Sequence, residues 1–177
     1  HKPIYRHMAG YTDIEKTKSI TAETTYWLYS VTKLITVTAA MQLVDKGRMD
    51  LDDPVYAYIP EYLQLKVKEG SEIRPAKQIM TIRHLFSMQS GLNYNISAPS
   101  IRKAISESNH EASTLDIVKA LAEEPLEFDP GTRYQYSLSH DVLGAVVEVV
   151  SGKLFDEYLS QYIFQPLGMK DTGFNLT

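Results

Sequence analysis

Cysteine is absent from this sequence of 177 residues, which excludes disulfide bonds, thiolate nucleophiles and cysteine-based zinc sites. The absence does not fix a compartment, because many exported proteins also lack cysteine. No apolar run approaches the roughly 18 residues that span a bilayer, and no charged and then apolar leader follows His1. We therefore expect no membrane segment in this chain and leave its localisation, cytoplasmic or exported, open.

The chain also lacks a large excess of charge of either sign, since it has 18 Lys and Arg and 22 Asp and Glu, for a net charge of −4. Without a basic patch we expect no nucleic-acid partner. The sequence has no H-E-x-x-H metal motif and no G-x-S-x-G nucleophile elbow. We expect no metal, no cofactor and no α/β-hydrolase triad. Of the histidines, His84 is expected to pack or cap a helix, His110 to be solvated and His140 to shape a site.

What the sequence does contain is Ser30-Val31-Thr32-Lys33, between an aromatic, strand-like run at 26–29 and an apolar helical stretch at 34–44. Three residues of separation put the Ser30 hydroxyl and the Lys33 amine on one face of the first helical turn. A lysine whose ammonium form is disfavoured by burial can take the proton of a serine nucleophile. The plain alternative is an N-cap serine followed by a solvated lysine.

A second S-x-x-K tetrad, Ser100-Ile101-Arg102-Lys103, shows that the motif alone proves little, because about one such tetrad is expected by chance in a chain of this composition. It opens a stretch rich in Ser, Glu and Asn without a sustained apolar stripe. We interpret it as a decoy. Only Ser30 leads from a strand-like segment directly into an apolar helix, as a rigidly held nucleophile requires.

Hydrophobic periodicity and turn residues predict a mainly helical chain with a few strands. The length fits one domain. A short strand pair cannot form a stable sheet alone, so we expect further sheet strands to be missing from this chain. The expected elements are strands at 4–9 and 24–29, helices at 31–46, 54–60, 81–88, 114–123, 139–150 and 154–164, an irregular segment at 64–78, and a turn at Asp129-Pro130-Gly131-Thr132.

Eight blocks, taken in order, closely resemble those of the class C β-lactamase-like serine hydrolases, which include β-lactamases, D-amino-acid peptidases, penicillin-binding proteins and carboxylesterases. The resemblance implies an α+β fold of the β-lactamase/DD-peptidase (serine transpeptidase-like) type. Residues 1–177 would be a partial domain, with a sheet hairpin at 1–29 and a helical region at 30–177. The blocks are Tyr29-Ser30-Val31-Thr32-Lys33, Leu51-Asp52-Asp53-Pro54-Val55, Thr81-Ile82-Arg83-His84-Leu85, Ser90-Gly91-Leu92, Pro130-Gly131-Thr132, Tyr136-Ser137, Leu143-Gly144 and Pro166-Leu167-Gly168-Met169.

The resemblance also implies roles. Ser30 would be the nucleophile that forms an acyl-enzyme, Lys33 the base that deprotonates it, and Tyr136 the group that shares this proton and delivers it to the leaving group. Tyr136 is one of twelve tyrosines, and only its block distinguishes it. The oxyanion hole would use the Ser30 N–H and an N–H from a later strand. The expected substrate contacts are Ser137, Leu138 and His140.

Two departures from the family pattern matter. β-Lactamases and peptidases usually carry Tyr-x-Asn where this chain has Tyr136-Ser137-Leu138, and a leucine cannot hydrogen-bond a substrate amide. This departure favours ester hydrolysis over efficient lactam hydrolysis. Family members are also about twice as long, and their third motif has no counterpart here, since Lys170-Asp171-Thr172-Gly173 belongs to another block. We expect a fragment that is inactive until a complementing segment of the same protein completes the sheet.

Three functional hypotheses result. The first is a serine hydrolase of a small-molecule ester, amide or β-lactam. The second is a penicillin-binding sensor module or D-amino-acid peptidase that acylates with little turnover. The third is a structural fragment that only pairs with a partner chain.

Overall fold

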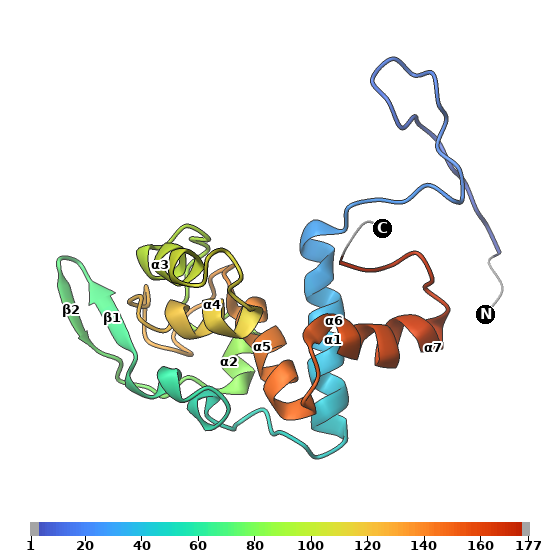
Figure 1. The fold of residues 1–177 in the computed structure, drawn as a ribbon. Coiled ribbons are helices and arrows are strands. Elements are labelled where there is room, and N and C mark those ends of the chain that lie inside the picture. The colour runs from blue at the N-terminus through green and yellow to red at the C-terminus, as the bar shows by residue number, and fades with distance from the viewer. Residues whose placement is uncertain (1–3, 175–177) are drawn as a thin grey trace.

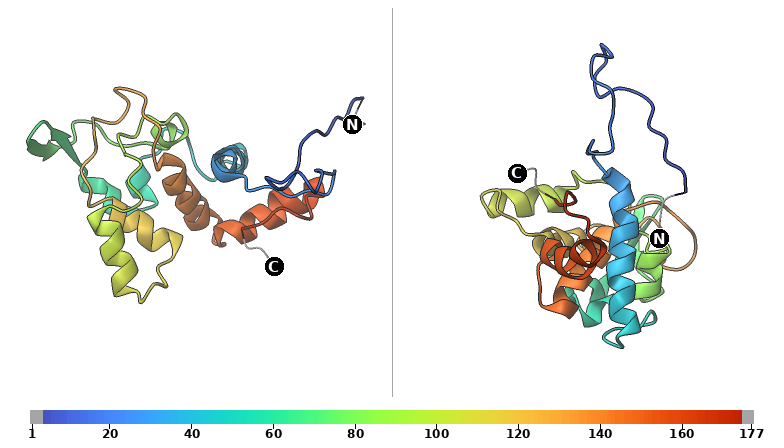
Figure 2. Two further views of the ribbon diagram at one scale, coloured as in Figure 1. Left: turned by 90° about the horizontal axis from the view of Figure 1, so that it is seen from above. Right: turned by 90° about the vertical axis from the view of Figure 1, so that its right-hand side faces the viewer.

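The computed structural model describes residues 4–174 and shows a group of packed helices from which the N-terminal residues extend as an arm (Figures 1 and 2). No helix in this part of the chain is long and apolar enough to cross a membrane. The helices are α1 (Thr32–Asp45), α2 (Ile82–Phe86), α3 (Pro99–Glu107), α4 (Thr114–Leu121), α5 (Ser139–Ser151), α6 (Phe155–Leu159) and α7 (Gln165–Leu167).

Helix α5 is the centre of the core. Its sequence is apolar on most sides, and nine of its thirteen residues are buried. It packs against α1, α2, α4 and α6, and Val142, Leu143, Val146 and Val147 are completely buried. Gly152 ends it in the left-handed conformation, as the sequence predicts. The first turn of α5 therefore starts from a rigid support.

Helix α1 matches its predicted range to within one residue at each end, and it is covered on only one side. Ala39, Ala40 and Leu43 are buried against the core. The opposite face exposes Val31, Leu34 and Met41, which are 52, 69 and 37% exposed. An apolar helix normally buries such a face against another layer.

The strands predicted at 4–9 and 24–29 are not formed, which corrects that part of the expected N-terminal hairpin. Within residues 4–28 the β-pairing is limited to an isolated bridge between Tyr11 and Ser19. Side chains such as Ile4, Ile14 and Trp27 are largely exposed. A strand is stabilised by its neighbours in a sheet, and no strand in the described part of the chain lies beside these segments.

The described sheet lies instead where an irregular segment was predicted. Strand β1 (Lys66–Glu69) pairs antiparallel with β2 (Glu72–Pro75). A two-residue turn with Gly70 in its first position joins them, which is a recognised hairpin pattern that could have been read from the sequence. The peptide groups of β1 also bond to Leu126 on the other side, which ties the hairpin to the core.

Several boundaries differ from prediction for local reasons. Two 3₁₀ turns, Val55–Ala57 and Pro60–Gln64, replace the helix expected at 54–60. Ser113, not Thr114, caps α4, because its hydroxyl and Asp116 form a capping box. Helix α3 was not predicted, although Pro99 at its first position favours a helix start. The helix expected at 154–164 is divided into α6 and a π-helical turn at Ser160–Phe164, and α7 continues beyond the expected end.

The predicted turn at Asp129–Thr132 is present, and the Thr132 N–H donates to the Asp129 carbonyl at 3.2 Å. Two nitrogens of Arg74 reach the two Asp129 carboxylate oxygens at 3.1 and 2.7 Å, and the Lys77 N–H donates to the same carboxylate. The bond with Arg74 holds the pKa of Asp129 below its ordinary value. Strand β2 thereby fixes the start of the loop that leads to Tyr136.

Among the glycines, Gly91 has the least room for a side chain. Its φ is +84°, and an added Cβ would lie 2.2 Å from the Phe128 carbonyl oxygen. Gly152 has a similar φ of +72° but open space around it. Gly91→Ala is therefore expected to lower the free energy of unfolding by about 3 kcal/mol, and Gly152→Ala by only about 1 kcal/mol. Urea unfolding of the two variants measures the difference, and equal losses would contradict the close contact.

Candidate active site

Ser30 lies in a 3₁₀ turn, Tyr29–Val31, that runs directly into α1. Tyr29 has a φ of +45°, which is unusual for a residue other than glycine. Backbone conformations of this kind concentrate at functional sites, where the surrounding structure holds them. The turn leaves Ser30 exposed at the start of the helical run, where backbone N–H groups of the first turn have no intrahelical partner.

Tyr136 is the direct partner of Ser30. Its hydroxyl donates to Ser30 Oγ at 2.6 Å, although the two residues are 106 positions apart. The ring of Tyr136, which is 43% exposed, stacks on Tyr94 with centroids 5.3 Å apart. The Lys33 amine lies over both rings, 5.0 Å from the Tyr136 centroid and 5.2 Å from the Tyr94 centroid. The three residues predicted to be catalytic are thus together.

The electrostatics of the group differ from the prediction for Lys33. Burial lowers the pKa of Lys33, but the interaction with Tyr136 and the charges of Tyr94 and Asp141 outweigh this effect and raise it overall. The hydrogen bond with Ser30 and the proximity of Lys33 lower the pKa of Tyr136 below its ordinary value. The environment therefore holds the proton of Lys33 more firmly and makes the phenol of Tyr136 more acidic than an ordinary tyrosine.

A cavity of about 330 Å³ opens beside Ser30 and Lys33. Helix α5 contributes His140, Asp141 and Gly144 to its wall. Among the described residues no cluster of three or more acidic or histidine side chains could hold a metal ion. The remaining lining residues are Tyr29, Thr32, Thr36, Tyr94, Thr114, Phe155 and Phe174.

Two of the predicted substrate contacts, Ser137 and Leu138, do not line this cavity. Ser137 is fully buried and Leu138 is 6% exposed. The Leu138 N–H donates to the Asn93 carbonyl at 3.0 Å, which turns the chain inward just before α5 begins. Neither side chain touches the space beside Ser30, so we do not carry them into a substrate-binding role.

His140 does line the cavity and is 9% exposed. Its Nε2 lies 3.3 Å from the Phe86 carbonyl oxygen, and its Nδ1 has no partner among the described residues. Burial lowers its pKa, which favours the neutral ring. His84 and His110 also agree with their predictions. The Nδ1 of His84 accepts from the Thr81 N–H in a capping box, and His110 is exposed.

Two residues of the site were not singled out from the sequence, Tyr94 and Asp141. Both stand next to blocks that carry the family resemblance, Tyr94 after Ser90-Gly91-Leu92 and Asp141 shortly before Leu143-Gly144. Asp141 is exposed as a residue, but its carboxyl group is partly desolvated by the surrounding protein, and this desolvation raises its pKa. The positive charge of Lys33 acts in the opposite direction. The location of Tyr94 and Asp141 beside these blocks is the sequence signal that could have identified them.

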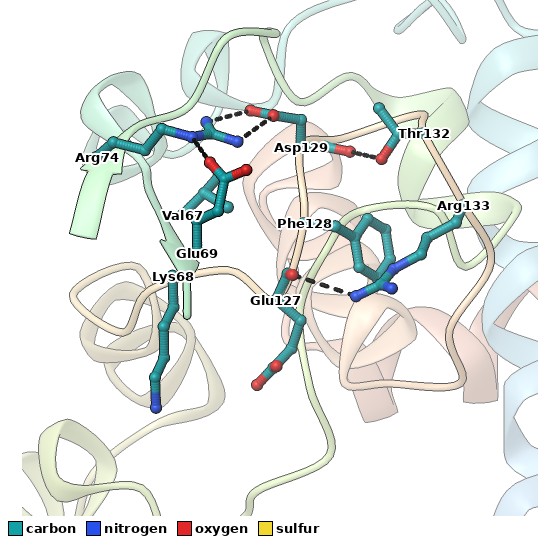
Figure 3. A pocket seen from close by; sticks show the side chains of 9 residues that line it. All are labelled: Val67, Lys68, Glu69, Arg74, Glu127, Phe128, Asp129, Thr132 and Arg133. Carbon is teal, nitrogen blue, oxygen red and sulfur yellow. Dashed lines mark hydrogen bonds and ion pairs between the residues drawn. The ribbon is translucent and has the colours of Figure 1, made fainter. Parts of the chain in front are cut away.

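The decoy tetrad is elsewhere. Ser100 is 7% exposed at the start of α3, and its hydroxyl has no partner in the described part of the chain. A second cavity, of about 270 Å³, lies between the β-hairpin and the segment at 127–133. Figure 3 shows that its wall is occupied by Arg74 forked on Asp129 and by Arg133 over the ring of Phe128. Arg74 forms ion pairs with Glu69 and Asp129, and Arg133 donates to the Glu127 carbonyl, so neither arginine contributes to the cavity beside Ser30.

A serine, a lysine and a tyrosine grouped at the start of a helix, beside a cavity, are the arrangement that acyl-transfer enzymes of the Ser–Lys–Tyr class require. The model of the Beta-lactamase family matches residues 1–177. The chain therefore belongs to the beta-lactamase family.

Named relatives agree with this membership. Esterase EstB of Burkholderia gladioli is 37% identical over 177 residues, covering 97% of this chain and 44% of that protein. Acyltransferase calJ of Penicillium decumbens is 33% identical over 176 residues, covering 95% and 42%. The solved structure of EstCE1, a hydrolase with promiscuous acyltransferase activity, matches with a TM-score of 0.80 at 31% identity, covering 98% of this chain and 45% of that one.

The chain thus spans less than half the length of the curated relatives that it matches. The predicted β-lactamase-like fold class is confirmed as a partial fold, rich in helices and with a two-stranded sheet in the described residues.

The pairing of Lys33 with Tyr136 gives a first test of the site. Lys33→Met is expected to raise the pKa of Tyr136 toward that of an ordinary tyrosine, because the cation that favours the phenolate is gone while the hydrogen bond with Ser30 remains. A pH titration by NMR of protein labelled with ¹³C at tyrosine Cζ, assigned with Tyr136→Phe, measures this shift.

Lys46→Met is the matched control, since the Lys46 amine lies 4.9 Å from the ring centroid of Tyr162, in another part of the chain. It should leave the titration of Tyr136 unchanged. A Tyr136 signal that titrates identically in the wild type and in Lys33→Met would contradict the proposed coupling.

Proposed function

We propose that this chain carries the nucleophile of a serine hydrolase that acts on small-molecule esters through an acyl-enzyme. The observation that carries the proposal is the hydrogen bond of 2.6 Å between the Tyr136 hydroxyl and Ser30 Oγ. A serine becomes an effective nucleophile when a neighbouring base accepts its proton. The lowered pKa of Tyr136 supports the role of base for the phenol. The raised pKa of Lys33 supports a protonated lysine that stabilises the phenolate, rather than a lysine that acts as the base.

The proton movements follow from this assignment. The Tyr136 phenolate takes the Ser30 proton as Oγ bonds to the ester carbonyl carbon. The neutral phenol then returns a proton to the leaving alkoxide as the ester C–O bond breaks. A water molecule attacks the acyl-enzyme by the same steps in reverse order, releasing the acid and Ser30. Lys33 stays protonated throughout and stabilises the phenolate.

An ester is favoured over a lactam as substrate for two reasons. Leu138 stands where β-lactamases usually carry an asparagine, and a leucine side chain cannot hydrogen-bond a lactam amide. The Leu138 side chain is also buried. Two of the relatives described above are named as an esterase and as an acyltransferase. Acyl transfer to an alcohol instead of water uses the same acyl-enzyme.

A complementing segment of the same protein is part of the proposal. The exposed apolar face of α1, with Leu34 at 69% exposure, is suited to cover by a sheet. Such a segment also supplies the second N–H donor of the oxyanion hole, because one backbone donor at Ser30 stabilises a tetrahedral intermediate less well than two. The short coverage of the relatives supports this part of the proposal.

Labelling of Ser30 by a fluorophosphonate tests the nucleophile. We expect stoichiometric labelling at Ser30, none in Ser30→Ala, and a rate about 10²- to 10⁴-fold lower in Tyr136→Phe, which removes the base. Ser100→Ala is the matched control, since Ser100 begins the other S-x-x-K tetrad, and it should label as fast as the wild type. Peptide mapping by mass spectrometry locates the adduct, and an adduct at Ser100 would refute the assignment.

Turnover by the 177-residue chain alone tests the need for a complementing segment. On an activated ester such as p-nitrophenyl butyrate we expect at most one acylation per Ser30 and no sustained release of product. Ser30-dependent turnover at enzyme-like rates, roughly 1 s⁻¹ or faster, would show that the chain needs no further segment. Labelling with a fluorescent β-lactam over time adds a comparison once the complementing segment is present, because a lactam adduct that stays permanent in the completed protein supports the sensor alternative.

A further inference from the structure

Three serine hydroxyls form a continuous chain in the core directly beneath the proposed base. Ser90 Oγ lies 2.7 Å from Ser139 Oγ, which lies 2.7 Å from Ser137 Oγ. All three side chains have no exposed surface. Ser137 is the residue next to Tyr136, and Ser139 begins α5, so the chain joins the loop at 88–93 to the segment that carries the phenol.

Both ends of the hydroxyl chain are closed by further partners. The Ser90 hydroxyl accepts from the Leu92 N–H at 3.1 Å. The Ser137 hydroxyl donates to the Met88 sulfur at 3.7 Å and accepts from the Ser139 N–H at 3.3 Å. Buried hydroxyls that are fully satisfied reinforce one another, whereas the loss of one member removes a hydrogen bond from each neighbour. Removal of the middle hydroxyl, that of Ser139, breaks both links between the serines.

Two backbone hydrogen bonds also connect the loop at 88–93 to the segment that carries Tyr136. The Gln135 N–H donates to the Met88 carbonyl at 2.9 Å, and the Leu138 N–H donates to the Asn93 carbonyl at 3.0 Å. Tyr136 lies between these two bonds, and its exposed ring touches Tyr94, which follows the same loop. The backbone on both sides of Tyr136 is thus bonded to the loop at 88–93.

We propose that Ser90, Ser139 and Ser137 act as positioning residues that hold the Tyr136 phenol within hydrogen-bond distance of Ser30. This inference rests on the proposed function, because it assigns the chain a part in the proton transfer between Tyr136 and Ser30. Displacement of a catalytic group by about 1 Å can lower a rate by two orders of magnitude. Ordinary core stabilisation would instead change the unfolding free energy and leave the geometry of the folded site as it is.

Ser139→Ala is the main test, with two readouts on folded protein at a temperature well below its unfolding midpoint. The first is the NMR titration of Tyr136, whose pKa should rise toward that of an ordinary tyrosine as the phenol moves away from Ser30 and Lys33. The second is the rate of Ser30 labelling by a fluorophosphonate, which should fall roughly 10- to 100-fold. Ser90→Ala, which leaves the Ser137 and Ser139 hydroxyls paired, should give a smaller change in the same direction.

Ser100→Ala is the matched control, because Ser100 is also a buried serine but its hydroxyl has no hydrogen-bond partner among residues 4–174. It should change neither readout. If Ser139→Ala fails to fold, as judged by circular dichroism, Ser90→Ala decides the question by both measurements.

The proposal is overturned if folded Ser139→Ala keeps the wild-type titration of Tyr136 and the wild-type labelling rate. Absence of Ser30 labelling in the wild type would count against the proposed function, and the titration of Tyr136 would still decide whether the serine chain positions the phenol.

Discussion

The hydrogen bond between the Tyr136 phenol and the Ser30 hydroxyl is the contact on which the site depends, because it joins segments 106 residues apart at 2.6 Å. Lys33, on the first turn of α1, gives this contact its electrostatic character. A protonated lysine beside two tyrosine rings favours the phenolate form of Tyr136. Ser30 and Lys33 come from one helix start, and the rest of the fold serves to bring Tyr136 to them.

That support comes from the core itself. Helix α5 is buried between α1 and the helices α2 and α4, so its first turn cannot move independently of the core. The segment before α5 is clipped to the loop at 88–93, and the turn at Asp129 is fixed by Arg74. Tyr136 lies between these two anchors. One face of α1, by contrast, exposes the apolar side chains of Val31, Leu34 and Met41.

The sequence predicted the parts of the structure that local chemistry determines. The apolar spacing of α1 and α5, the glycine after α5 and the turn at Asp129 all follow from nearest neighbours in the chain. The prediction of strands at 4–9 and 24–29 was wrong, because a strand is stabilised by the neighbouring strands with which it pairs. The grouping of Ser30, Lys33 and Tyr136 was predicted from the family resemblance. The direction of the Lys33 pKa was not, because it depends on Tyr94 and Asp141, which only the fold brings close.

A crystal structure of the chain phosphonylated at Ser30 tests the central claim most directly. We predict that the Tyr136 hydroxyl remains within about 2.6–3.2 Å of Ser30 Oγ in the adduct, with the Lys33 amine farther from that oxygen and close to the phenol. A structure in which the Lys33 amine contacts Ser30 Oγ and the Tyr136 ring is turned away from it would contradict the account.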